Sequence, residues 1–184
     1  MILFVNKNHI FNESMIDNLE MVEYENFQEK TLFIEINTYE HFRMLQAHLK
    51  IDGVQVDITD AYRSLETQEN LFLKYMNRYG MDAAENMVAM PGTSDHHTGQ
   101  ALDIAIYKDD VWVTDETDLL KEEEIFDKIH SCLKYFGFIV RYPKNKESIT
   151  CYSYKPWHIR YIGEKNSMEI GDLTLEEYLD NGKK

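Results

Sequence analysis

The sequence has few residues that interrupt or cross-link a chain, with only three prolines and two cysteines among 184 residues. It contains no internal repeat, no low-complexity tract and no linker rich in Ser, Gly or Pro, so we predict a single domain over residues 1–184. Two cysteines exclude a disulfide-dense scaffold. Cys132 and Cys151 lie far apart along the chain, and the sequence does not say whether they pair.

Long hydrophobic runs are also missing, and none approaches the roughly 20 residues of a membrane span. The N-terminal run MILFV is too short for a signal peptide. We therefore expect a cytoplasmic protein from this sequence as it stands, or an extracellular or cell-wall protein if the chain is part of a longer one.

Basic residues are scarce, because 19 Lys and Arg stand against 33 Asp and Glu and give a formal net charge of −14. This balance disfavours nucleic acid and anionic membranes as partners, since binding to phosphates requires clustered cations. The acidic runs DDVWVTDETDLLKEEE and GDLTLEEYLDNG are predicted to be solvated helix faces or turns, because neither has the pattern of a calcium-binding loop.

The composition that remains is that of a globular protein, with 43% hydrophobic and 12% aromatic residues. Hydrophobic periodicity predicts helices over residues 38–53, 67–79, 82–90, 118–136 and 174–180. It predicts strands over residues 2–6, 30–36, 54–59, 100–107 and 138–142, and one that ends near residue 163. The order is irregular, so we predict an α+β fold with a small, mostly antiparallel central sheet flanked by helices.

Three segments carry residues suited to chemistry, namely DAYRSLETQ (60–68), SDHHTGQALD (94–103) and KPWH (155–158). His96 and Asp103 can converge if their loop folds onto the following strand, and His158 can add a third donor from a neighbouring strand. Two imidazoles and one carboxylate suit Zn²⁺ and leave a fourth position open. The adjacent His97 is expected to point elsewhere. No HExxH, GxSxG, CxxC or phosphate-binding loop is present.

The motif Ser-x-His-x-x-Gly-x-Ala-x-Asp, followed about fifty residues later by Pro-Trp-His-x-Arg-Tyr-x-Gly, resembles the VanY-type D-alanyl-D-alanine carboxypeptidases. These are zinc peptidases of bacterial cell-wall metabolism, within the wider LAS or M15 peptidase group. Further segments occur in the family's order, namely VNKNH, YRSLETQENLF, GFIVRYP and LTLEEYL. The resemblance covers nearly the whole chain and implies a fold like that of the Hedgehog proteins and DD-peptidases.

The resemblance implies a role for each matching residue. His96, Asp103 and His158 would be the zinc ligands, and Arg63 would hold a carboxylate or carbonyl oxygen of the substrate. The remaining predicted substrate-binding residues are Gln68 and Ser94, which would line the peptide site, and Trp157, which would form a wall of it. The implied partner is a peptidoglycan stem peptide or precursor that ends in D-Ala.

Lys155 departs from the family pattern, in which a glutamate stands three residues before the last zinc-binding histidine as the general base. A charged lysine cannot accept a proton and adds a second cation close to the metal. A general base contributes about 10²–10⁴-fold to the rate, so this replacement puts the activity in question.

Three readings of Lys155 stay open. In the first reading the protein is a catalytically inactive pseudoenzyme that binds stem-peptide-like ligands or a protein partner without cleaving them. It is alternatively an active carboxypeptidase in which a neutral Lys155, or a nearby carboxylate such as Asp95, is the base. In the third reading it is an interaction protein without metal. We also expect Asp60 to pair with Arg63 or Lys155.

Overall fold

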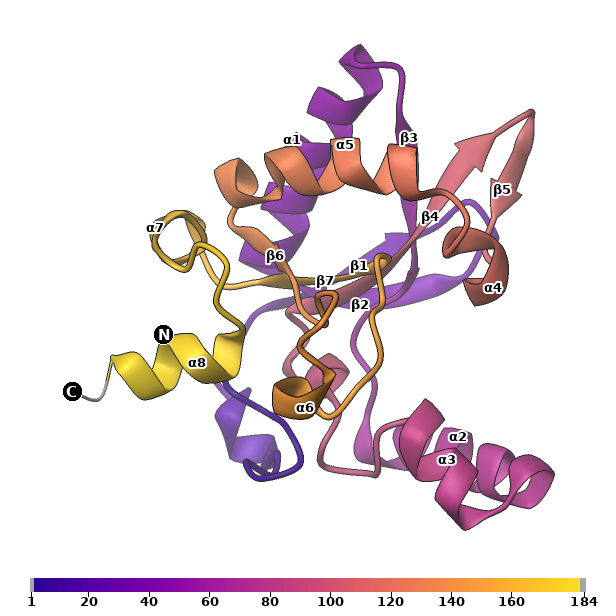
Figure 1. Ribbon diagram of the computed structural model, residues 1–184, viewed down its shortest axis with the longest axis vertical. Coiled ribbons are helices and arrows are strands. Elements are labelled where there is room, and N and C mark those ends of the chain that lie inside the picture. Colours follow the sequence, from indigo (N-terminus) through magenta and orange to yellow (C-terminus); the bar gives the residue numbers. More distant parts are fainter. Residues whose placement is uncertain (1, 183–184) are drawn as a thin grey trace.

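In the computed structural model, which describes residues 2–182 without the side chains of residues 86 and 181, the chain adopts an α+β fold (Figure 1). The strands are β1 (Met21–Glu25), β2 (Thr31–Glu35), β3 (Gln55–Asp60), β4 (Ala101–Lys108), β5 (Val111–Val113), β6 (Phe138–Val140) and β7 (His158–Tyr161). The helices are α1 (Ile36–Ile51), α2 (Leu65–Tyr79), α3 (Met81–Met87), α4 (Glu116–Leu119), α5 (Glu123–Leu133), α6 (Glu147–Thr150), α7 (Glu164–Glu169) and α8 (Leu175–Asn181). Short 3₁₀ turns are η1 (Glu13–Met15), η2 (Asp95–Thr98) and η3 (Lys134–Phe136). This arrangement confirms the predicted class.

The central sheet is antiparallel, and β4 is its middle strand. The strand order is β3-β4-β7-β6, and β5 pairs with the far end of β4, while β1 and β2 form a separate hairpin. The register sets Asp103 of β4 opposite Asp60 on one side and opposite His158 on the other. Directly opposite residues of antiparallel strands project to the same face of a sheet, so these three side chains form one row across three strands.

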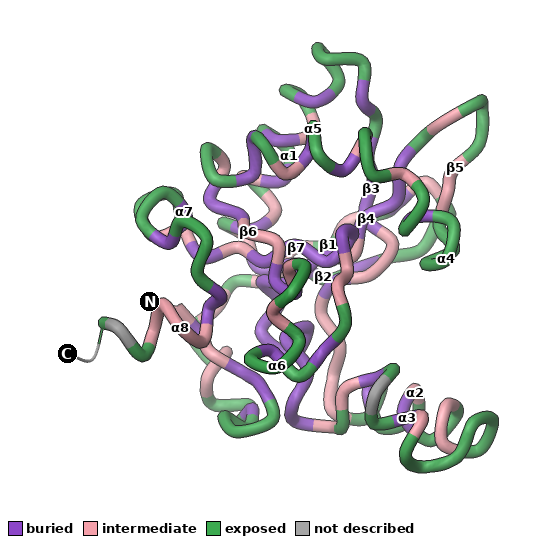
Figure 2. The backbone as a smooth tube through the Cα atoms, viewed as in Figure 1, coloured by how far each residue is buried: buried purple, intermediate pink, exposed green. Residues whose placement is uncertain are grey.

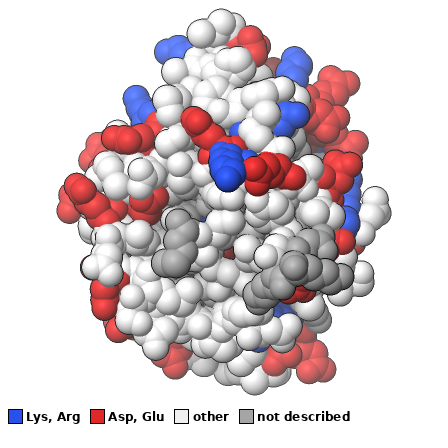
Figure 3. All heavy atoms as spheres, turned by 90° about the vertical axis from the view of Figure 1, so that its left-hand side faces the viewer, with Lys and Arg blue, Asp and Glu red and all other residues white. Residues whose placement is uncertain are grey.

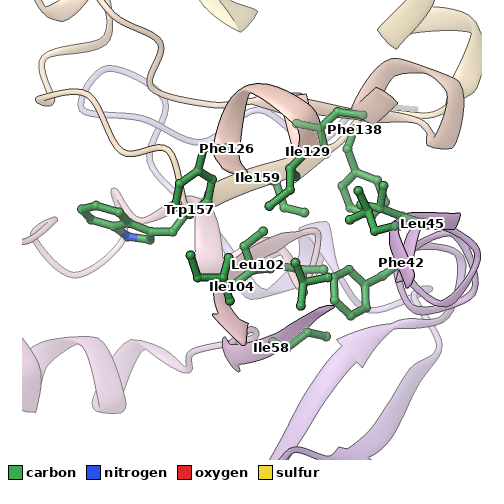
Figure 4. Close-up of a cluster of buried hydrophobic side chains, with 14 of the residues drawn as sticks. Phe42, Leu45, Ile58, Leu102, Ile104, Phe126, Ile129, Phe138, Trp157 and Ile159 are labelled. Atoms are coloured by element: carbon green, nitrogen blue, oxygen red, sulfur yellow. The ribbon is translucent and has the colours of Figure 1, made fainter. Parts of the chain in front are cut away.

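The main hydrophobic core lies on the other face of the sheet, where α1 and α5 cover it (Figure 4). Apolar residues at three-to-four spacing on both helices meet alternate residues of the strands. The buried members are Phe42, Leu45, Leu49, Phe126, Ile129 and Leu133 from the helices and Val56, Ile58, Leu102, Ile104, Ile106 and Ile159 from the strands. Figure 2 shows burial concentrated along the central strands.

The helices α2 and α3 pack on each other apart from this core, through Phe72, Ala84 and Val88. Ser64 caps α2 by accepting a hydrogen bond from the backbone N–H of Thr67. The pair lies on the other side of the central strands from α1 and α5 (Figure 1).

Two sequence predictions of secondary structure are wrong. Residues 2–6 form no strand. Instead of pairing with a strand, the backbone carbonyl oxygen of Leu3 accepts a hydrogen bond from Nη2 of Arg160. The helix predicted over residues 118–136 is divided into α4, α5 and η3. A turn at residues 120–122 separates α4 from α5.

Two further features follow from the described residues. Cys132 is buried and Cys151 is exposed, and both are free thiols. Among residues 2–182, none of the helices combines the length and the apolar character that crossing a bilayer requires.

Candidate active site

The three predicted metal ligands come together around Asp103, the middle residue of this row. Nε2 of His96 lies 3.2 Å from Oδ2 of Asp103, and Nδ1 of His158 lies 2.8 Å from Oδ1 of the same carboxylate. One donor atom from each of the three residues lies within 4.8 Å of the other two. The two imidazole rings meet edge to face with centroids 4.9 Å apart. Asp103 thus bridges both histidines.

A tight turn brings His96 to this position. The 3₁₀ turn η2 ends at Gly99, whose φ of 69° is in the left-handed region that favours glycine. A Cβ at Gly99 would also stand 2.6 Å from Cε of Met21, so that side chain would have to move to admit one. The chain can therefore reverse within the turn and enter β4, which carries Asp103.

The donor set fits a bound cation. Nδ1 of His96 lies 2.6 Å from the carbonyl oxygen of Ala61 and donates to it, so the Nε2 of a neutral ring presents a lone pair to Asp103. Burial, followed by the charge of Arg63, lowers the pKa of His96 and keeps the ring neutral. Two acceptors, Nε2 and the Asp103 oxygen, then face each other at 3.2 Å, and a metal ion between them resolves that repulsion.

Arg63 is fixed beside this cluster by hydrogen bonds on three sides. Its guanidinium donates to Asp60 at 2.9 Å, to Oε1 of Gln68 at 3.0 Å and to Oδ2 of Asp103 at 3.3 Å. Its backbone N–H donates to the carbonyl oxygen of His96. The predicted pairing of Asp60 with Arg63 is present, and the guanidinium is oriented before any ligand arrives.

These residues form the floor of a cavity of about 280 Å³. Its lining includes an apolar side from α2, α3 and the segment after them, with Leu71, Tyr75, Met87 and Val88. The polar lining consists of Thr59, Asp60, Arg63, Ser94, His96, Asp103, Glu116, Tyr142, Tyr152, Lys155 and His158. A larger hollow of about 510 Å³ lies between β6 and α7 and contains none of the predicted site residues.

Lys155 lines the same cavity and is partly buried. Its backbone N–H donates to the carbonyl oxygen of Tyr142, and its own carbonyl oxygen accepts from the N–H of His158. The lysine therefore belongs to the turn that delivers His158 into β7. The cavity lining includes two cationic side chains, those of Arg63 and Lys155, beside three carboxylates. On the face that carries α7 and α8, Asp and Glu side chains are more prominent than Lys and Arg (Figure 3).

Two predicted substrate-binding residues are not in the cavity lining. Trp157 is 4% exposed and packs in the main core near Phe126, as Figure 4 shows. Neighbouring residues of an extended chain project to opposite sides, so the backbone that turns His158 into the cavity turns Trp157 away from it. Gln68 is fully buried behind Arg63, where it also donates to the carbonyl oxygen of Ala89, so it orients the guanidinium.

Ser94 does line the cavity, and its hydroxyl makes no hydrogen bond with the rest of residues 2–182. His97 is directed away from the metal cluster, as expected. Its Nε2 accepts from the N–H of Gly92 and its Nδ1 donates to the carbonyl oxygen of Arg63. The ring therefore ties together the two loops that carry Ser94 and Arg63.

Asp95 is unsuited to the role of base that one reading gave it. The side chain is fully buried behind His158, and Oδ1 accepts from Nη1 of Arg160 at 2.6 Å, while Oδ2 lies 3.5 Å from Nε of Arg141. Burial alone would raise the pKa of this carboxyl group, but the two guanidinium groups outweigh burial and hold the pKa far below its usual range. Oδ2 also lies 3.8 Å from Nε2 of His158, so Asp95 faces the back of that ligand.

The sequence reasoning missed Glu116, which belongs to the acidic run predicted to be solvated. It enters the cavity from α4, outside the three segments that carry the predicted site residues. It also missed Tyr142 and Tyr152, whose rings pack on each other, with Tyr142 against His158. No local pattern distinguishes these residues, because the fold alone brings them to the cavity.

Comparison with known proteins identifies the family. A family model described as D-alanyl-D-alanine carboxypeptidase, VanY, matches residues 31–164. The chain belongs to the VanY D-alanyl-D-alanine carboxypeptidase family.

The chain is 38% identical over 138 residues to the Bacillus subtilis protein YodJ, a match covering 73% of this chain and 49% of the relative. It is 34% identical over 140 residues to the bifunctional D-Ala-D-Ala dipeptidase and carboxypeptidase VanXYC of Enterococcus gallinarum, covering 72% of this chain and 71% of the relative. The chain thus spans about half the length of the first of these relatives.

Solved structures agree with this assignment. A mutant of VanY from a VanB-type resistance cassette, in complex with Zn(II), superimposes with a TM-score of 0.79 at 30% identity, covering 96% of this chain and 97% of that one. VanYB in complex with D-alanine-D-alanine has a TM-score of 0.78 at 28% identity, covering 97% and 96%. The LD-carboxypeptidase LdcB has a TM-score of 0.78 at 32% identity, covering 96% and 84%.

Proposed function

We propose that this protein is a zinc-dependent carboxypeptidase that acts on peptidoglycan stem peptides and removes a C-terminal D-alanine, slowly because of Lys155. The observation that supports it best is the cluster of His96, Asp103 and His158 beside an oriented Arg63 on the floor of one cavity. Family relatives with named D-Ala-D-Ala activity and a structure with Zn(II) support the same assignment.

His96, Asp103 and His158 would hold the zinc, in the His₂-carboxylate set common to zinc peptidases. Zinc held in this way supplies Lewis-acid polarisation and acidifies water. The buried hydrogen bond from Nδ1 of His96 to the carbonyl oxygen of Ala61 leaves Nε2 to face the metal position.

Arg63 would bind the terminal carboxylate or the carbonyl oxygen of the peptide. Asp60 and Gln68 hold its guanidinium in one orientation, so little rotamer freedom is lost when the ligand binds. Ser94 offers a free hydroxyl nearby, and the apolar side formed by α2 and α3 suits the methyl groups of alanine residues.

Lys155 supports a second candidate function, a protein that binds stem-peptide-like ligands without cleaving them. The side chain lies in the cavity lining, where its ammonium group can pair with a peptide carboxylate but cannot accept a proton while charged. The lone pairs that face each other at His96 and Asp103 argue against the third reading, an interaction protein without metal.

The test is D-alanine release from a pentapeptide ending in D-Ala-D-Ala and from a tetrapeptide ending in a single D-Ala, with zinc-supplemented protein. We expect release by the wild-type protein at a rate below that of Lys155→Glu, in which a glutamate again stands at the family's general-base position. His158→Ala, which removes a ligand, is the control and should bind less than one equivalent of zinc. Absence of both zinc binding and release, in the wild-type protein and in Lys155→Glu, would refute the proposal. Release by Lys155→Glu alone would favour the second candidate.

A further inference from the structure

The cavity contains three carboxylates, and two of them are already engaged. Asp60 accepts hydrogen bonds from Nε of Arg63 and from the N–H of Ala61, and Asp103 faces two imidazoles. The side-chain carboxylate of Glu116 makes no hydrogen bond and no ion pair within 4 Å to any other part of residues 2–182, although the backbone carbonyl oxygen accepts from the N–H of Leu120. It is therefore the cavity carboxylate left available for a ligand or a proton.

The position of Glu116 is set by rigid neighbours on both sides. It is the first residue of α4, and the preceding Asp115 caps the helix by accepting from the N–H groups of Thr117 and Asp118. Leu119, at the end of α4, is 3% exposed and anchors the helix in the main core. Figure 1 shows α4 directly after the β4–β5 hairpin, which begins on the strand of Asp103.

The charges around Glu116 couple it to the site. Glu116 remains open to solvent at the mouth of the cavity, but partial loss of water around its carboxyl group raises the pKa, and the cation of Lys155 counteracts that rise. The negative charges of Asp103 and Asp115 also raise the pKa of Glu116, and the positive charge of Arg63 lowers it. Glu116 therefore lines the same cavity as Asp103 and as Lys155, the residue at the family's general-base position.

We propose that the Glu116 carboxylate is the proton acceptor of the hydrolytic reaction and fills, from α4, the role that the cation of Lys155 cannot fill. This inference rests on the proposed function. The attacking water gives one proton to Glu116 as its oxygen bonds to the carbonyl carbon of the scissile amide. The C–N bond then breaks, and the proton passes from Glu116 to the nitrogen of the departing D-alanine. Glu116 returns to its ionised form, and Lys155 stabilises it by its charge.

Other candidates for the acceptor are less suitable. Asp95 is enclosed behind His158 and bonded to Arg160, so it has no access to the cavity. Asp60 is held by Arg63, and protonating it would weaken the ion pair at 2.9 Å that orients the guanidinium.

The experiment compares four proteins, namely the wild type, Glu116→Gln, Lys155→Glu and the double variant, with Glu124→Gln as a control. Glu124 is an exposed glutamate at the start of α5, outside the cavity lining, and its substitution makes the same change of charge. D-Alanine release is followed as kcat and KM separately. Zinc content after gel filtration and calorimetric affinity for the pentapeptide provide readouts that do not depend on turnover.

We expect Glu116→Gln to lower kcat about 10²–10⁴-fold relative to the wild type, as loss of a general base does. In the Lys155→Glu background, a glutamate again stands at the family position, so the same substitution should change kcat less than about threefold. Zinc content and pentapeptide affinity should match those of the wild type, and Glu124→Gln should behave as the wild type in every assay.

Three results would overturn the inference. The first is an unchanged kcat in Glu116→Gln, and the second is loss of zinc from that variant, which would make Glu116 part of the metal site. The third is D-alanine release by Lys155→Glu with none by the wild type. This result would refute the role of Glu116 but would still support the metal and peptide site of the proposed function. Release by neither protein, without bound zinc, would refute the proposed function and the inference together.

Discussion

Replacing Asp95 with asparagine tests whether the buried charges behind His158 stabilise the fold. Asp95 lies between two fully buried arginines, Arg160 and Arg141, and Arg141 makes a bidentate contact with Glu176 at 2.6 and 2.9 Å. Two guanidinium groups and two carboxylates give this cluster no net formal charge. Asp95→Asn leaves one positive charge without compensation in a site that water does not reach.

The geometry sets the size of the expected effect. At the 2.6 Å separation of Arg160 and Asp95, the Coulomb attraction is about 6 kcal/mol at an effective dielectric constant of about 20. An amide oxygen still accepts a hydrogen bond, so part of this is retained. Removing one partner of a buried pair costs about 3–5 kcal/mol, which is the loss of unfolding free energy that we expect.

Urea unfolding at pH 7, followed by circular dichroism, measures this loss directly. With a slope of about 2 kcal/mol per molar urea, the midpoint should fall by about 2 M. Asp118→Asn is the control, because it removes an exposed contact with Lys121 and should leave the midpoint nearly unchanged. A loss below about 1 kcal/mol in Asp95→Asn would refute the reasoning, since desolvation of the charges would then cancel their attraction.

Two further predictions concern a turn and a titrating group. Gly137→Ala should lower the free energy of unfolding by more than about 1 kcal/mol, because φ is 79° and the new Cβ would stand 2.5 Å from Cε2 of Tyr161. Gly53→Ala, with φ of 78° and open space around it, should cost clearly less in the same urea titration, and equal losses would contradict the steric argument. Burial lowers the pKa of His130 in the folded protein below its value in the unfolded chain. The unfolded chain therefore binds the proton first as the pH falls, and the free energy of unfolding should decrease below pH ~6.5. Urea midpoints at pH 8 and 5.5 should differ less in His130→Gln than in the wild type, and an equal difference would contradict this account.

Much of the fold could be predicted from local patterns in the sequence. The apolar spacing of α1 and the alternation along β4 define each element by itself, because the period of the pattern fixes which face is buried. The strand predicted over residues 2–6 was wrong for a reason outside that segment, since it depends on Arg160, more than 150 residues away. Hydrophobicity alone does not show whether a buried segment pairs with a sheet.

Some residues of the candidate site could likewise be predicted from local patterns, and others could not. His96, Asp103 and His158 belong to motifs with fixed spacing, and the structure brings them together. The side on which Trp157 lies could have been predicted from its position next to His158, because alternation applies to both residues. Glu116 could not, because its place depends on a turn, a short helix and a buried leucine that have no signature of their own.

The row formed by β3, β4 and β7 ties the metal donors to the packing of the protein. If β7 slipped by one residue against β4, His158 would enter the core and Trp157 the cavity, and every buried side chain of that strand would be misplaced. Core packing therefore holds the register that sets His158 opposite Asp103. Lys155 precedes β7 and lies outside the strand pairing, so its side chain does not set this register. Chemistry in this protein can change at one residue while the architecture that supports it stays the same.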